Sequence, residues 1–63
     1  MENRIKEIRE EEGIKQNALA KMTGLSAGYI NHLEKGIRKN PSYKAMTKIA
    51  TALNRKVQEV FNI

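Results

Sequence analysis

One predicted helix carries a run of small and polar residues along a single side. With about 100° between successive residues, five positions of the segment 27–35 share this outer face. They are Ala27, Gly28, Asn31, His32 and Lys35. None of them is a large apolar residue, and the polar members can donate or accept hydrogen bonds. The face is therefore either ordinary solvated surface or a surface that contacts a polar partner.

Metal chemistry has little support in these residues. His32 is the only histidine, the chain has no cysteine and no aspartate, and Glu34 is the only acidic residue near it. Transition-metal sites need several His, Cys or carboxylate ligands together, so we expect no metal. His32 is then either an exposed polar side chain or a contact to the partner of this face.

Catalysis has equally little support. The chain has no Ser–His–acid set of compatible spacing, no glycine-rich phosphate loop and no paired carboxylates in an apolar setting. The glutamates at 10–12 fall on a face that we expect to be solvated. We therefore expect no enzymatic activity and no cofactor.

Positive charge is concentrated after the first predicted helix. The net charge is +5: residues 1–14 carry −2, and residues 15–63 carry +7. The segment 35–44 contains four bases, Lys35, Arg38, Lys39 and Lys44. This distribution suits a protein with one face toward a polyanion and one face away from it, although a solvated basic loop is the simpler alternative.

Helical periodicity predicts five helices and no strand. Their predicted ranges are 2–12, 16–23, 27–35, 43–53 and 57–61. Gly24 should end the second helix and Ser26 should cap the third, which leaves a three-residue connection between crossing helices. Lys15 is a poor N-cap, so the first turn of the second helix should either fray or be held by Gln16. Ile37 should anchor the following loop to the core.

The core is expected to be aliphatic. Five residues of the fourth helix fall on one arc of about 140°, and Val57, Val60 and Phe61 should face inward from the last helix. The members on the fourth helix are Ala45, Met46, Ile49, Ala50 and Leu53. Tyr29 should lie in the core, whereas Tyr43 should point outward.

Length and composition limit the organisation of the chain. Sixty-three residues suit a single domain, 1–63. No apolar run approaches the roughly 18 residues of a membrane span, and the charged N-terminus is unlike a signal peptide. We expect a cytoplasmic protein without a membrane partner. Nothing follows the last predicted helix, so we expect no separate regulatory domain on this chain.

Three segments of the sequence resemble those of a known family. RIKEIREEEGIKQNALA, KMTGLSAGYINHLEKG and NPSYKAMTKIATAL resemble the phage repressor and Cro family of helix-turn-helix DNA-binding domains, of the xenobiotic-response-element-like type. The specific signal is Gln-x-x-Leu-Ala at 16–20, then Gly24, Ile30 and Leu33-Glu34-x-Gly36. The resemblance implies an all-α, compact, lambda-repressor-like domain of five helices. Its third helix would lie in the major groove of double-stranded DNA, and its second would cross the backbone.

Residue roles follow from the resemblance by position. It implies base contacts from Ala27, Gly28, Asn31 and His32. Together with the basic segment, it implies phosphate contacts from Gln16, Ser26, Lys35, Arg38, Lys39, Tyr43 and Lys44. It also implies a partly buried salt bridge between Arg9 and Glu34.

The sequence departs from the family pattern at several positions. Thr23 replaces an aliphatic residue, and Ala27 and Gly28 replace longer polar side chains. Asn31 could bind adenine N6 and N7 with both ends of its amide, and Ala27 could contact a thymine methyl group. No arginine projects from the third helix, so we expect modest specificity.

These features together predict a sequence-specific transcriptional regulator that binds DNA as a homodimer and is largely monomeric when free. Contacts between subunits are expected near Val60, Phe61 and Ile63. The alternative is a protein-interaction module on the same fold, such as the antitoxin of a toxin–antitoxin pair. If salt weakens binding steeply, DNA binding would be favoured over the protein-interaction module.

Overall fold

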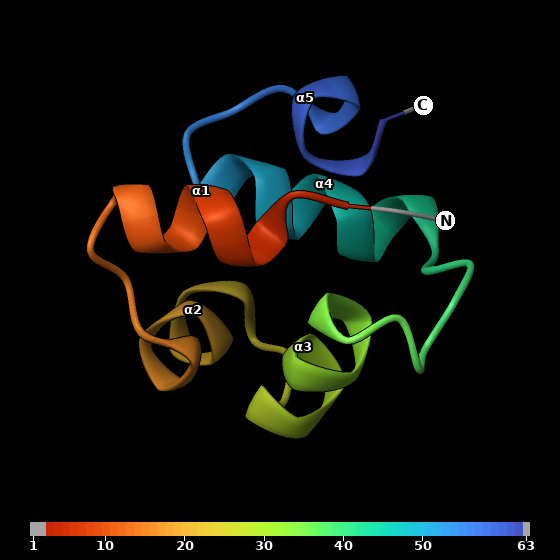
Figure 1. The fold of residues 1–63 in the computed structure, drawn as a ribbon, viewed down its shortest axis with the longest axis horizontal. Helices are drawn as coiled ribbons and strands as arrows, with labels where there is room; N and C mark the ends of the chain where they lie inside the picture. The colour runs from red at the N-terminus through yellow and green to blue at the C-terminus, as the bar shows by residue number, and fades with distance from the viewer. Residues whose placement is uncertain (1–2, 63) are drawn as a thin grey trace.

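The computed structural model describes residues 3–62, and these form five α-helices and no strand. The helices are α1 (Ile5–Glu11), α2 (Gln16–Thr23), α3 (Ala27–Glu34), α4 (Tyr43–Ala52) and α5 (Val57–Phe61). In Figure 1, α2 and α3 lie together below α1 and α4, and α5 lies on the opposite side. α4 packs against both α2 and α5, so it joins the two sides. The predicted all-α architecture is confirmed.

The first helix begins later than predicted, at Ile5 and not at residue 2. Asn3 explains the difference, because its side-chain oxygen accepts a hydrogen bond from the Ile5 N–H at 3.1 Å. Its amide nitrogen donates to the Leu33 carbonyl at 2.9 Å, and the Arg4 N–H donates to the Val60 carbonyl at 2.7 Å. Residues 3 and 4 thus tie α1 to α3 and α5 instead of extending the helix.

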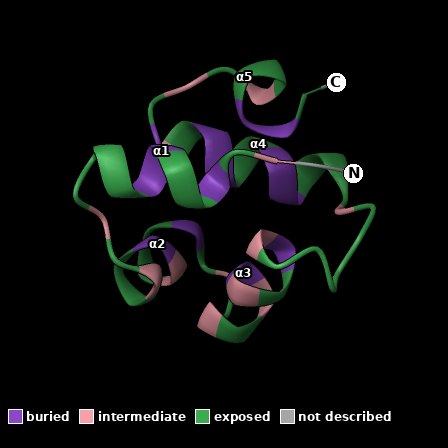
Figure 2. Cartoon of the chain, viewed as in Figure 1, coloured by how far each residue is buried: buried purple, intermediate pink, exposed green. Residues whose placement is uncertain are grey.

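Buried aliphatic side chains and Phe61 form one core between the helices. Figure 2 shows that the buried positions lie on the inner sides of the helices. The fully or nearly fully buried members include Ile5, Ile8, Leu19, Ile30, Leu33, Ile49, Leu53, Val60 and Phe61. Ala45, Met46 and Ala50 complete the predicted arc on α4, and Val57 and Tyr29 pack partly buried against it.

The turn between α2 and α3 has the predicted chemistry. Gly24 adopts a left-handed conformation with φ of 74°, and its N–H donates to the Ala20 carbonyl at 2.9 Å. Ser26 caps α3 by accepting from the Tyr29 N–H at 3.0 Å. Thr23 is buried, but its hydroxyl donates to the Leu19 carbonyl at 2.8 Å and accepts from the Leu25 N–H at 3.2 Å. A threonine can therefore replace the usual aliphatic residue without leaving a polar atom unpaired.

The predicted anchoring role of Ile37 is wrong, because its side chain is 65% exposed. The loop is held by its backbone. The N–H groups of Ile37 and Arg38 both donate to the His32 carbonyl, at 2.9 and 3.1 Å. Gly36, with φ of 76°, makes the reversal that brings them there. The end of α3 is thus closed by hydrogen bonds and needs no apolar contact from residue 37.

The C-terminal region is buried as predicted and also makes ion pairs that were not predicted. Val60 and Phe61 are fully buried, which agrees with their predicted inward positions. Ile63 lies outside the described residues, and the subunit contact expected near these three residues stays a prediction. Glu11 and Glu12, expected to be solvated only, also pair with Arg55 at 3.4 and 3.0 Å. These pairs join the end of α1 to the connection between α4 and α5.

Matched substitutions test the contrast between Ile49 and Ile37. Removing one methyl from the fully buried Ile49 (I49V) should lower the free energy of unfolding by about 0.5–1.5 kcal/mol, because it leaves a small cavity. The same change at the exposed Ile37 (I37V) should alter it by less than about 0.5 kcal/mol. Urea unfolding followed by circular dichroism measures both. Equal losses at the two positions would contradict the placement of Ile37.

Candidate nucleic-acid interface

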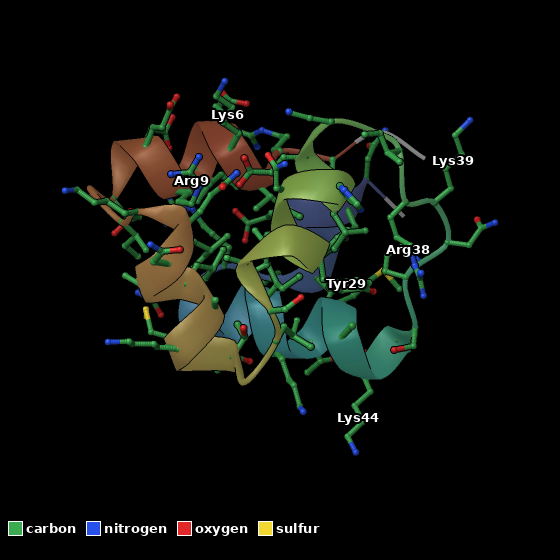
Figure 3. All side chains as sticks on the ribbon, turned by 90° about the horizontal axis from the view of Figure 1, so that it is seen from below. Lys6, Arg9, Tyr29, Arg38, Lys39 and Lys44 are labelled. Atoms are coloured by element: carbon green, nitrogen blue, oxygen red, sulfur yellow. The ribbon has the colours of Figure 1, made fainter. Side chains whose placement is uncertain are left out.

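The outer face of α3 lies where the sequence places it. Gly28, His32 and Lys35 are exposed, and Ala27 and Asn31 are partly buried. Ile30 and Leu33 point into the core from the other side of the helix. Figure 3 views the molecule from the side on which α2 and α3 lie. On this side, the small and polar groups of α3 lie between α2 and the basic loop formed by residues 35–42.

An ion pair holds this side to the rest of the molecule. Arg9 Nε lies 2.8 Å from Glu34 Oε2, and Arg9 Nη2 donates to Glu34 Oε1 at 3.2 Å. The side chains are only 11% and 3% exposed, and Arg9 Nη1 also donates to the Ile14 carbonyl at 2.9 Å. Hydrogen bonding to the carboxylate raises the pKa of Arg9 above its ordinary value. The pair expected from the resemblance is therefore present, and it connects α1 with α3.

The side chain of Gln16 takes part in the same group. Its Nε2 donates to Glu34 Oε1 at 2.9 Å and to Asn31 Oδ1 at 3.2 Å. Gln16 therefore holds the first turn of α2 against α3, which is one of the two outcomes expected for it. Its contact with Asn31 was not anticipated, because it depends on how closely α2 and α3 approach.

The N-terminus of α2 has no side-chain cap. Lys15 occupies the N-cap position in an extended conformation, and its side chain accepts no hydrogen bond. The first backbone bond of the helix runs from the Leu19 N–H to the Lys15 carbonyl at 2.9 Å. The N–H groups of the first turn have no acceptor within the helix. Such groups, with the positive end of the helix dipole, can bind an anion.

Exposed bases lie at the end of α3, on the loop after it and in the first turn of α4. Lys35, Arg38, Lys39 and Lys44 are all exposed, and Tyr43 is 67% exposed. The Arg38 guanidinium lies over the Tyr29 ring, 5.3 Å from its centroid, which restrains the loop beside α3. In Figure 3, Lys39 and Lys44 extend from different edges of the molecule. The predicted basic group is thus spread along the surface and is not a single cluster.

Residues 3–62 offer neither of two other kinds of feature, a metal site and a membrane-spanning helix. No group of three or more His, Cys, Asp or Glu side chains could hold a metal ion there. None of the helices described is both long and apolar enough to cross a membrane.

A helix-turn-helix family model matches residues 5–60. The chain belongs to the helix-turn-helix family. Among relatives, an uncharacterised HTH-type transcriptional regulator of Archaeoglobus fulgidus is 43% identical over 97% of this chain and 84% of its own length. The HTH-type transcriptional regulator SinR of Bacillus licheniformis is 30% identical over 94% of this chain. The chain spans only 53% of that SinR, about half its length.

Solved structures of the helix-turn-helix family have the same fold. The restriction-modification controller protein C.AhdI from Aeromonas hydrophila matches with a TM-score of 0.84 and 38% identity, over 89% of this chain and 83% of C.AhdI. SinR in a complex with DNA matches with a TM-score of 0.84 and 31% identity, over 87% of each chain. These helix-turn-helix proteins share nearly the whole arrangement of helices seen here.

The Arg9–Glu34 pair should be important for stability. The substitution E34Q leaves the buried Arg9 guanidinium without its counter-charge, so the free energy of unfolding should fall by up to about 3 kcal/mol. The matched control is E7Q, which breaks an exposed pair with Arg4 on α1. Its effect should be much smaller, because solvent screens exposed pairs. Urea midpoints compare the two, and an unchanged midpoint for E34Q would contradict the importance of the buried pair.

Proposed function

We propose that residues 1–63 form one domain that binds double-stranded DNA in a sequence-dependent manner and regulates transcription. The single observation that carries this proposal is the outer face of α3, which is small and polar, is flanked by the basic loop, and belongs to a helix-turn-helix fold. α3 would enter the major groove and α2 would cross the DNA backbone.

α3 would read base edges with few side chains. Asn31 is the member of the face best suited to a directional contact, and Ala27 can contact a thymine methyl group. His32 can supply one donor or acceptor, and Gly28 lets the backbone come close. Because no arginine projects from α3, the commonest guanine contact is missing and specificity should be modest.

Phosphate contacts would supply most of the affinity. The exposed candidates on the loop and on α4 are Lys35, Arg38, Lys39, Tyr43 and Lys44. Ser26 accepts a hydrogen bond within α3 but keeps its own hydroxyl proton for a phosphate. Gln16 uses its side-chain nitrogen inside the protein, so it would contact phosphate through its backbone N–H.

Relatives support the DNA-binding reading. The archaeal relative and SinR are named as HTH-type transcriptional regulators, and SinR is solved in a complex with DNA. We propose that the chain acts in the cytoplasm and binds as a dimer, each subunit on one half-site about one helical turn from the other. Because Val60 and Phe61 are buried, a subunit contact near the C-terminal end would use the exposed residues beside them.

A second function has one specific observation in its favour. A chain in a complex of SinR with the protein SinI matches this chain with a TM-score of 0.83 and 31% identity, over 87% of this chain and 53% of the matched chain. A protein of this fold can therefore form a complex with a protein partner. A role as a protein-interaction module, for example an antitoxin, is the alternative to DNA regulation.

Salt dependence tests the proposed function. Sites selected from random duplexes should be bound with an affinity that falls steeply between about 50 and 200 mM salt, because phosphate binding releases counterions. Binding that is insensitive to salt, or selection that enriches no sequence, would overturn the proposal.

Two variants should separate recognition of the base sequence from overall DNA affinity. N31A should reduce discrimination between the selected and a scrambled duplex by about 1–3 kcal/mol, while non-specific binding stays nearly unchanged. K39A should weaken both duplexes alike and lower the salt slope by roughly one unit. Titrations on both duplexes at two salt concentrations measure these effects. Equal weakening of both duplexes by N31A would show that α3 is not the reading helix.

A further inference from the structure

A continuous chain of hydrogen bonds runs from the core to the outer face of α3. Arg9 donates to both oxygens of Glu34, at 2.8 and 3.2 Å. Gln16 Nε2 donates to Glu34 Oε1 at 2.9 Å and to Asn31 Oδ1 at 3.2 Å. The chain ends at Asn31, which lies partly buried on the face proposed to read DNA. Its first members lie on α1 and α3, and its link to Asn31 comes from α2.

Elementary chemistry determines the direction of every bond in this chain. A guanidinium only donates hydrogen bonds, and a carboxylate only accepts them. The Gln16 atom that faces Glu34 must therefore be the amide nitrogen. The same nitrogen faces Asn31, so the Asn31 atom that meets it must be the carbonyl oxygen. The Glu34 side chain is 3% exposed and is bonded to Arg9. Neither water nor rotation of the Glu34 side chain can therefore reverse which groups donate and which accept.

This order determines what Asn31 can offer to a partner. Its carbonyl oxygen is directed toward Gln16, and within residues 3–62 its amide nitrogen donates to no protein group. Binding adenine with both ends of the amide requires the oxygen to accept from N6 while the nitrogen donates to N7. The observed orientation leaves both amide protons of Asn31 free to donate, while Gln16 already occupies one of the two lone pairs of the Asn31 oxygen, so donation is favoured. Guanine, which presents two neighbouring acceptors at O6 and N7, matches donation better than adenine does.

We infer that Gln16 is a specificity-determining residue, which acts by orienting the Asn31 amide so that Asn31 presents hydrogen-bond donors and selects guanine over adenine. The inference rests on the proposed DNA-binding function and deepens it. Gln16 is a positioning residue, because it acts through Asn31. Without Gln16, the Asn31 amide is free to turn over, and the adenine contact expected for an unrestrained asparagine becomes available.

The substitution Gln16→Met tests this inference. Methionine is of similar length but lacks the amide donor, and Gln58→Met makes the same change on the exposed surface of α5 as a control. Binding is measured on duplexes in which each base pair of a selected half-site is replaced in turn. The position read by Asn31 is identified as the one at which Asn31→Ala removes discrimination.

The expected result is a change at that position alone. The wild-type protein and Gln58→Met should prefer guanine over adenine there by about tenfold, the value of one good base contact. Gln16→Met should lose or reverse this preference and keep the others. A wild-type preference for adenine at that position, or an unchanged preference in Gln16→Met, would overturn the inference while DNA reading by α3 stood. Equal binding of all duplexes by the wild-type protein would overturn the proposed function and the inference together.

A measurement on the free protein separates orientation from folding. The side-chain amide resonances of Asn31 in a nitrogen–proton NMR spectrum should shift in Gln16→Met and remain in place in Gln58→Met, while the dispersed backbone spectrum shows that both variants are folded. Unchanged Asn31 resonances in a folded Gln16→Met would overturn the hydrogen-bonded orientation itself.

Discussion

The buried pair between Arg9 and Glu34 is the interaction on which the arrangement of the recognition helices depends. It lies where α1 meets α3, and Gln16 extends it to α2. A carboxylate that is 3% exposed is costly unless its oxygens are fully bonded. Here they accept from two nitrogens of Arg9 and from Gln16. The requirement to satisfy one buried charge thus aligns three helices, and the outer face of α3 inherits its position from that alignment.

Much of the fold follows from short-range chemistry. Gly24 and Ser26 mark the turn between α2 and α3 because one permits a left-handed backbone and the other caps the next helix. The arc of apolar residues on α4 is buried because helical spacing puts its members on one side. The outer face of α3 could be predicted for the same reason. These features depend on neighbours within a few positions, so the sequence alone is sufficient to place them.

Two of the missed features depend on contacts between distant segments, and the third depends on the hydrogen bonds that close a loop. The first helix begins at Ile5 and not earlier because Asn3 bonds to Leu33 and to the Ile5 N–H. Ile37 is exposed because backbone bonds to His32 already hold its loop. The contact of Gln16 with Asn31 requires the distance between α2 and α3, which no local pattern contains. Residue type and periodicity indicate which side of a helix is inward, but they do not indicate which polar group will be met there.

The start of α2 lacks a side-chain cap, which lowers the stability of the helix. A Ser or Asp at position 15 would satisfy a first-turn N–H and stabilise a helix by about 1 kcal/mol. Lys15 supplies no such acceptor. The helix begins at Gln16, whose side chain bonds to Glu34 of α3. A capping oxygen here would compete with any phosphate for the same N–H groups, and an aspartate would also repel it. The start of α2 is thus less stable than a capped helix start would be, by about the free energy of one missing cap.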